Sequence, residues 1–226
     1  DPNTLKAKSQ KLEYEDEFNL IPKRIVIIGK KYFRPKIEFY RKLKISQGFA
    51  FRFSYLSKNH FKNKSFILVS LNLDHKINKD ILDIINGSQF LKNKKIIFKI
   101  HPALKLNEKE FIDNKNIISN MPFKDLIRKS KVFITAGSSS TIVESICNGV
   151  PVVIPFKDDM TEFSLKSIGL PKQLYNVCAN KKNFDETLNY LLKKNNTYSL
   201  KKLNKIKKDY FNLYKDKNLI NFQKFL

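Results

Sequence analysis

The stretch VFITAGSSSTIVESICNGVPVVIPF, residues 132–156, decides the fold. It opens with a short β-branched run at 132–134 and closes with another at 152–154, and each run predicts a buried strand. Between the two runs, apolar residues recur at helical spacing from Thr141 onwards. Gly149 and Pro151 predict the end of that helix, because glycine accepts the left-handed conformation beyond the last turn and proline cannot continue a helix. The stretch therefore predicts a strand–helix–strand unit with a right-handed crossover.

The same alternation of apolar runs and helical spacing extends through most of the chain. Strands alternating with helices predict an α/β fold with a doubly wound, Rossmann-like parallel sheet. We expect further strands at 24–28, 49–53, 66–71, 95–100, 116–119 and 174–178. We expect further helices at 5–18, 35–44, 77–91, 107–112, 123–130, 159–168 and 184–193, and a long basic helix from Leu200.

A polar stretch at 57–64 predicts a boundary between two parts of the chain. We expect residues 61–226 to form the Rossmann-like domain, ending in the basic C-terminal helix. We expect residues 1–60 to be the tail or remnant of a preceding domain.

The chain is strongly basic, with 44 Lys and Arg residues against 21 Asp and Glu residues and a net charge of +23. Only five of these 44 are Arg, so 39 are Lys, and they are spread along the sequence. Nucleic-acid binders usually gather charge on one face and use Arg for bidentate contacts, so nucleic acid is disfavoured as a partner. Attraction to an anionic membrane surface or to acidic substrates fits the charge better.

Other features of the composition indicate a cytoplasmic protein, peripheral at most on the inner face of a membrane. No apolar run approaches 18 residues, which excludes a transmembrane helix from the expected structure. Residues 1–20 lack the apolar core of a signal peptide. The two cysteines, Cys147 and Cys178, fall in an expected helix and an expected strand, and we expect buried free thiols.

The turn at 137–141 is the first candidate binding site. Gly137 is followed by four hydroxyl side chains, Ser138, Ser139, Ser140 and Thr141, at the carboxyl end of a strand and the start of a helix. Unpaired helix N–H groups and hydroxyls at this position suit a phosphate. Ordinary helix capping explains the same residues without a ligand. One turn later, Glu144 could accept hydrogen bonds from ribose hydroxyls, or it could be an exposed, solvated side chain.

Three other strand ends could reach the same edge of the sheet. His101 directly follows a strand and could meet a phosphate or a leaving group. Asn72 ends another strand, and Met121 and Phe123 follow a third, where they could offer apolar surface to a base. The alternatives are an ordinary surface or core histidine and an ordinary turn. The chain shows no metal-ligand spacing, no GxGxxG, no Walker A loop and no GxSxG elbow, so we expect no metal and no cofactor.

The segment GSSSTIVESICNGVPVVIPF resembles the donor-binding segment of GT-B glycosyltransferases, with its small-residue turn, a Thr three residues before a Glu, and GxPxxxPF. In the peptidoglycan N-acetylglucosaminyl transferase and its relatives, the turn and helix start hold the donor phosphates and the Glu holds the ribose. The resemblance covers roughly residues 64–195. It implies phosphate binding by Gly137 to Thr141 and ribose binding by Glu144.

The segment KIHP, residues 99–102, resembles the HP motif of bacterial polysialyltransferases and of capsule and lipopolysaccharide sugar transferases. In those enzymes the His contacts the phosphate of a CMP-sugar, and a downstream Ser-Ser/Thr motif shares the task. Teichoic-acid glycerophosphotransferases have a similar arrangement. The resemblance implies that His101 acts in catalysis together with Ser138 to Ser140, on a donor of the CMP or UDP type.

Taken together, these resemblances imply the donor-binding part of a glycosyltransferase of surface polysaccharide or lipopolysaccharide synthesis, with a glycan or lipid-linked acceptor. GT-B enzymes place the acceptor site in an amino-terminal domain that is nearly absent from residues 1–60, so the chain alone could bind a donor without transferring it. A nucleotide-sugar epimerase of the same fold and a non-catalytic nucleotide-binding module remain as alternatives.

Overall fold

The computed structural model of the chain describes residues 24–29, 44–57, 64–104, 117–137, 140–157, 159–167, 169–193 and 198–213. Two compact units form, one from residues 1–54 with 205–226 and the other from residues 55–204. The helices expected at 5–18 and 107–112 lie outside the described residues, as does the helix expected at 35–44 except for its last residue. Among the described residues, no helix has the length and apolar character needed to cross a bilayer.

The smaller unit contains a pair of parallel strands, β1 (Arg24–Ile27) and β2 (Lys44–Gln47). Asn212, near the end of the last described segment, bonds to the residues that follow both strands. Its side-chain amide donates to the Gly48 carbonyl at 2.7 Å, and its backbone N–H donates to the Ile28 carbonyl. Phe53 and Phe211 pack with ring centroids 4.4 Å apart.

The strand expected at 49–53 is wrong, because residues 51–57 form a 3₁₀ helix, η3 (Phe51–Ser57). Alternating aromatic residues suggested a half-buried strand there, but the Phe53 N–H bonds the Ala50 carbonyl three residues back.

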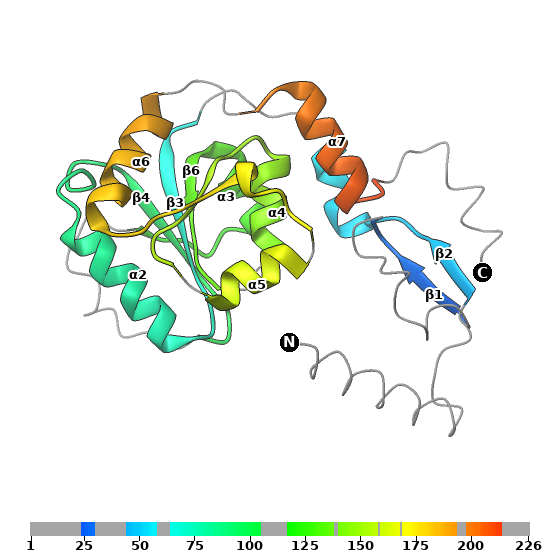
Figure 1. Cartoon of the computed structure of the whole chain (residues 1–226), viewed down its shortest axis with the longest axis horizontal. Helices are drawn as coiled ribbons and strands as arrows, with labels where there is room; N and C mark the ends of the chain where they lie inside the picture. The colour runs from blue at the N-terminus through cyan, green and yellow to red at the C-terminus, as the bar shows by residue number, and fades with distance from the viewer. Residues whose placement is uncertain are drawn as a thin grey trace. The chain divides into compact units, whose positions relative to one another are not determined.

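The larger unit is built on a six-stranded, wholly parallel sheet with strand order β5-β4-β3-β6-β7-β8 (Figure 1). This confirms the predicted α/β fold. The strands are β3 (Phe66–Leu71), β4 (Ile96–Ile100), β5 (Ile117–Ile118), β6 (Ser130–Ile134), β7 (Val152–Ile154) and β8 (Tyr175–Val177).

Helices cover both faces of this sheet. One face carries α2 (His75–Gly87) and α6 (Lys181–Lys193), and the other carries α3 (Phe123–Lys129) and α4 (Ser140–Cys147) (Figure 1). The Ser88 hydroxyl, just after α2, donates a hydrogen bond to the Asp185 carboxylate of α6. The remaining elements are α5 (Asp159–Ser167), η5 (Lys172–Leu174) and α7 (Leu200–Tyr210).

Two helices differ in length from the sequence expectation. Helix α2 begins two residues early, at His75, because the Asp74 carboxylate caps it by accepting from the Ile77 N–H at 3.1 Å. It ends at Gly87 and not at residue 91, since the Ser88 N–H turns back to the Ile85 carbonyl. Helix α6 begins at Lys181, three residues before the expected start.

The strand–helix–strand unit that the sequence indicated is present as β6, α4 and β7. The two apolar runs in its strands are fully buried, with Val132, Phe133, Ile134, Val152, Val153 and Ile154 all at 0% exposure. Gly149 adopts φ 67° after the last turn of α4, and the Val150 N–H bonds the Ser145 carbonyl, so the helix ends as the glycine predicted. Cys147 and Cys178 are buried free thiols, as expected.

Candidate functional site

Three neighbouring strands bring candidate residues to the carboxyl edge of the sheet. His101 directly follows strand β4, Asn72 directly follows β3, and β6 runs into the turn at Gly137. The His101 N–H donates to the Leu71 carbonyl at 3.1 Å, and the Asn72 side-chain amide donates to the Ala136 carbonyl at 3.0 Å. Two strand spacings separate β4 from β6, so His101 and the Gly137 turn lie about 10 Å apart along the edge.

Asn72 has a structural part in this arrangement that its place in the sequence did not reveal. Its side-chain oxygen accepts the Asp74 N–H at 2.7 Å, while its backbone exchanges two hydrogen bonds with the Asn78 side chain. The side chain therefore ties the turn after β6 to the start of α2. This contact holds the Gly137 turn in position whether or not a ligand binds.

The turn after β6 depends on a glycine. Gly137 has φ 80°, which side-chain-bearing residues rarely adopt, and a Cβ there would lie 2.5 Å from the Asn72 side-chain nitrogen. The Gly137 N–H donates to the buried Thr161 hydroxyl of α5 at 2.6 Å, so this backbone donor is already used within the protein. Sequence reasoning missed Thr161, because its link to the turn spans 24 residues and leaves no local pattern.

The hydroxyl cluster is only partly described. Ser138 and Ser139 lie outside the described residues, whereas Ser140 is exposed at the start of α4 and Thr141 is half-buried. The first turn of α4 therefore begins at the carboxyl edge, beside the turn that carries Gly137. A helix start at this place offers N–H groups and the positive end of the helix dipole to an anion.

His101 is exposed on this edge and has a defined hydrogen bond. Its Nδ1 accepts the Ala103 N–H at 3.2 Å. An accepting Nδ1 places the proton of the neutral imidazole on Nε2, which can donate to an anion. His101 thus has the chemistry expected of a phosphate contact.

Met121 and Phe123 follow β5, on the other side of His101 from the Gly137 turn. Met121 is 45% exposed, so it offers apolar surface to a ligand. Phe123 is half-buried, and its ring packs edge-to-face on Phe133 with the centroids 5.3 Å apart. Much of Phe123 therefore serves the core beneath the edge.

Glu144 is only 6% exposed, so the alternative that it is a solvated surface side chain is wrong. The Tyr55 hydroxyl of η3 donates to its Oε1. Ser145 and Asn148 of the same helical segment are buried as well. The Ser145 hydroxyl donates to the Thr141 carbonyl, and the Asn148 side-chain amide donates to the Glu144 carbonyl. Local hydrogen bonds to the helix backbone satisfy these side chains without solvent.

Tyr55 and Arg128 form a cluster around Glu144 that sequence reasoning did not find. The Arg128 guanidinium lies 4.8 Å from the centroid of the Tyr55 ring, and its Nη2 donates to the Tyr55 carbonyl at 3.3 Å. Burial, the charge of Glu144 and the hydrogen bond to it raise the pKa of Tyr55 well above its ordinary value, although Arg128 acts in the opposite direction. Tyr55 is therefore a neutral hydrogen-bond donor to Glu144. Contacts across more than 70 residues left no signal in the local sequence pattern.

Close by, Lys64 is partly buried, and its ammonium group donates to the Gly149 carbonyl at the end of α4 at 2.9 Å. Burial lowers the pKa of Lys64 from 10.5 to about 8. Within the described ranges, no three His, Cys, Asp or Glu side chains gather into a group that could hold a metal ion.

Solved structures similar to this chain include two that are described as glycosyltransferases and MurG. CalG4, the calicheamicin glycosyltransferase, matches 84% of this chain and 48% of its own at a TM-score of 0.53 and 12% identity. MurG of Acinetobacter baumannii matches 91% of this chain and 67% of its own at a TM-score of 0.51 and 12% identity. The glycosyltransferase of kitacinnamycin matches 84% of this chain and 51% of its own at a TM-score of 0.50 and 12% identity.

At these identities the similarity establishes the fold alone, namely the Rossmann-like domain of the GT-B architecture. The chain spans about half the length of the first solved structures that it matches. No curated protein matches it in sequence.

A family model matches residues 95–210, which include His101, the Gly137 turn and Glu144. The model is that of UDP-glucoronosyl and UDP-glucosyl transferase, and its match covers slightly more than half of the 226 residues. The chain therefore belongs to the UDP-glucoronosyl and UDP-glucosyl transferase family.

Proposed function

We propose that this chain is the donor-binding part of a glycosyltransferase that uses a UDP-sugar. The observation that carries the proposal is the family match over residues 95–210, because it spans the edge where His101 and the start of α4 lie. The sequence left CMP and UDP donors open, and the family favours UDP. The resemblance to the HP motif supports a role for His101 but does not distinguish a cytidine from a uridine donor.

The reaction would transfer a sugar from the diphosphate to an acceptor hydroxyl. The bond between the sugar's anomeric carbon and the diphosphate oxygen breaks while the acceptor oxygen bonds to the same carbon. UDP leaves as an anion, and the acceptor's proton passes to a base outside the residues assigned here. Negative charge grows on the departing diphosphate, so the Nε2–H of His101 and the N–H groups of the first turn of α4 would stabilise the transition state.

Within this proposal, Gly137 and the hydroxyls of Ser138, Ser139, Ser140 and Thr141 surround the diphosphate. Glu144 accepts hydrogen bonds from the ribose. Because the Tyr55 hydroxyl already donates to Glu144, a ribose hydroxyl would replace one neutral donor by another at the same carboxylate. The exposed side chain of Met121 would face the base, with Phe123 supporting it from behind.

We further propose that the acceptor is a glycan or a lipid-linked sugar of surface polysaccharide or lipopolysaccharide synthesis. The net charge of +23 supports work beside an anionic membrane, on its cytoplasmic face. The resemblance of residues 99–102 to capsule and lipopolysaccharide transferases supports the same pathway.

Calorimetric titration of the chain with UDP, CMP, CDP and GDP tests the proposal. We expect saturable binding of UDP in preference to the other three nucleotides. His101→Ala should weaken UDP binding about tenfold or more, which corresponds to losing one hydrogen bond to a charged group. Asn93→Ala is the matched control, since Asn93 is also an exposed polar residue but lies in the turn before β4, at the opposite edge of the sheet. Equal affinity for all four nucleotides, or equal losses in the two variants, would contradict the proposal.

A further inference from the structure

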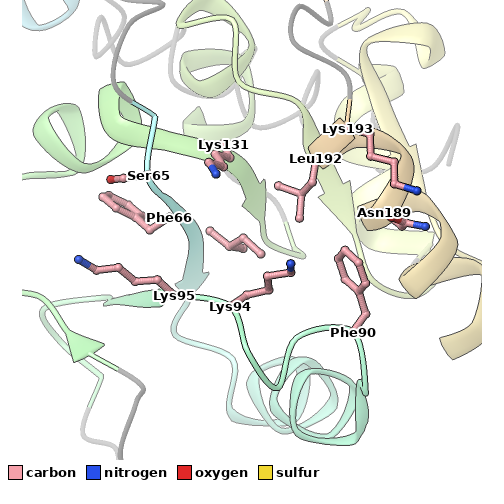
Figure 2. Close-up of a pocket in the computed structure, with 10 residues that line it drawn as sticks. Ser65, Phe66, Phe90, Lys94, Lys95, Lys131, Asn189, Leu192 and Lys193 are labelled. Atoms are coloured by element: carbon pink, nitrogen blue, oxygen red, sulfur yellow. The ribbon is translucent and has the colours of Figure 1, made fainter.

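A cavity of about 250 Å³ lies at the amino edge of the sheet, opposite the edge that carries His101. Its walls come from the start of β3, the turn before β4, the second residue of β6 and the end of α6 (Figure 2). The described lining includes four lysines, Lys94, Lys95, Lys131 and Lys193, and no acidic residue.

The four ammonium groups have no carboxylate partner among the described residues. None of these lysines forms an ion pair or a side-chain hydrogen bond with any part of the chain that the structure describes. Like charges gathered around one hollow repel each other, and a bound anion would remove that repulsion. Lys193 lies in the last turn of α6, where the helix dipole alone favours a cation, so its position does not by itself indicate a bound anion.

Lys131 gives the clearest sign that the cavity is built for a ligand. It lies in β6, in the interior of the sheet, where its neighbours Ser130 and Val132 are fully buried, yet Lys131 itself is exposed. The pairing of β6 with β3 skips it, because Phe66 pairs with Ser130 and Ile67 with Val132. An extra residue of this kind re-aims a side chain, and such bulges are enriched beside functional sites.

Lys94 faces the same hollow from the other side. Its ammonium group lies 5.1 Å from the centroid of the Phe90 ring, which holds it over the cavity wall. Figure 2 shows the ammonium groups of Lys94 and Lys131 towards the middle of the cavity and those of Lys95 and Lys193 at its margins. Phe90 and Leu192 add apolar surface between the charges.

From this arrangement we infer that the amino-edge cavity binds a phosphate-bearing ligand, with Lys94 and Lys131 as its main contacts. A phosphate or diphosphate group supplies several acceptor oxygens, enough for two ammonium groups at once. The apolar wall at Phe90 and Leu192 would contact whatever carbon skeleton the phosphate carries. The same chemistry could come from a soluble phosphate compound or from a lipid headgroup. The site is separate from the proposed donor site, so either can fail alone.

The test compares two double variants of the full chain. Lys94→Gln with Lys131→Gln removes the two central charges. Lys92→Gln with Lys129→Gln removes two charges from exposed positions that lie two residues earlier in each segment and do not line the cavity. Both variants therefore change the net charge equally and leave the core intact. The first probe is inorganic pyrophosphate. Its binding is measured by phosphorus NMR and by calorimetry, each at low and at moderate salt.

We expect wild-type protein to bind pyrophosphate saturably, the cavity variant to lose affinity about tenfold or more, and the control variant to change less than about threefold. Pyrophosphate bound at the Gly137 turn would be insensitive to both variants, so the difference between them isolates the cavity. Equal losses in the two variants would assign binding to the overall charge and overturn the inference. The inference would also be overturned if the cavity variant bound pyrophosphate as tightly as the wild type. It would be overturned as well if the wild type bound neither pyrophosphate nor the vesicles described below.

Co-sedimentation with vesicles identifies the source of the phosphate. Vesicles of phosphatidylglycerol with phosphatidylcholine are compared with vesicles of phosphatidylcholine alone. If the cavity variant alone loses binding to the anionic vesicles, the ligand is a lipid headgroup. If the cavity variant loses pyrophosphate but binds vesicles like the control, the ligand is a soluble phosphate compound. Vesicle binding that falls equally in both variants, without pyrophosphate binding, would contradict the inference.

Discussion

The turn after β6 can be tested by placing a single methyl group on it, in Gly137→Ala. The φ of 80° at this position costs a residue with a side chain about 1–2 kcal/mol. The added Cβ would also lie 2.5 Å from the Asn72 side-chain nitrogen, so Asn72 must move. Its hydrogen bond to the Ala136 carbonyl, now 3.0 Å long, would be lost or stretched at a cost of about 1 kcal/mol. We therefore expect the free energy of unfolding to fall by about 2–3 kcal/mol.

Urea unfolding followed by circular dichroism measures this change. Gly87→Ala is the matched control, because Gly87 ends α2 without a positive φ and its added Cβ would meet only the flexible end of Lys181. Alanine in that helical position should leave stability within about 1 kcal/mol of wild type. The same Gly137→Ala protein, if folded, should bind UDP at least about tenfold more weakly. If Gly137→Ala were as stable as wild type and bound UDP equally, the turn would not have the conformation or the role that we assign to it.

Three further predictions concern the interior. Between pH 7 and pH 10, the free energy of unfolding of the wild type should rise by up to about 3 kcal/mol relative to that of Lys64→Met. The reason is that the folded chain releases the Lys64 proton near pH 8, whereas the unfolded chain holds it to about pH 10.5. Urea unfolding at a series of pH values measures this, and the control Lys92→Met, at an exposed site, should show no such trend relative to the wild type. Tyr55→Phe should strengthen UDP binding severalfold in calorimetry, because it removes the competing donor to Glu144, and weaker binding would refute that competition. Phe98→Ala, at a fully buried position in β4, should cost about 3–5 kcal/mol in thermal or urea unfolding, and a loss below 1 kcal/mol would contradict the described core.

Much of the fold followed from the sequence because its signals are local. β-branched runs marked the buried strands of the large sheet, and Gly149 marked the end of α4 through the conformation that only glycine adopts readily. The strand predicted at 49–53 was wrong, because the alternating aromatic side chains there belong in part to a 3₁₀ helix and not to a strand. The order of the strands was not predicted, because pairing between distant segments leaves no local pattern.

The candidate site was predictable to the same extent. The carboxyl ends of parallel strands share one edge, so His101, Asn72 and the Gly137 turn could be placed together before any coordinates. The supporting contacts could not, since Thr161 reaches Gly137 from α5 and Tyr55 reaches Glu144 across 89 residues. Glu144 is buried beside Tyr55, and its helical position alone therefore left a solvated side chain open as an alternative. The roles of Gly137 to Thr141, His101, Glu144, Met121 and Phe123 towards a donor stay predictions.

UDP binding at the carboxyl edge of the large sheet is the function that we propose for this chain. A ¹H–¹⁵N NMR titration of the chain with UDP tests this most directly, because it reports on each backbone amide separately. We predict saturable shifts at His101 and at residues 135–144, at UDP concentrations lower than any that shift Lys94 and Lys131 on the opposite edge. A folded protein whose amides do not respond, or whose shifts gather at the amino edge, would contradict the claim.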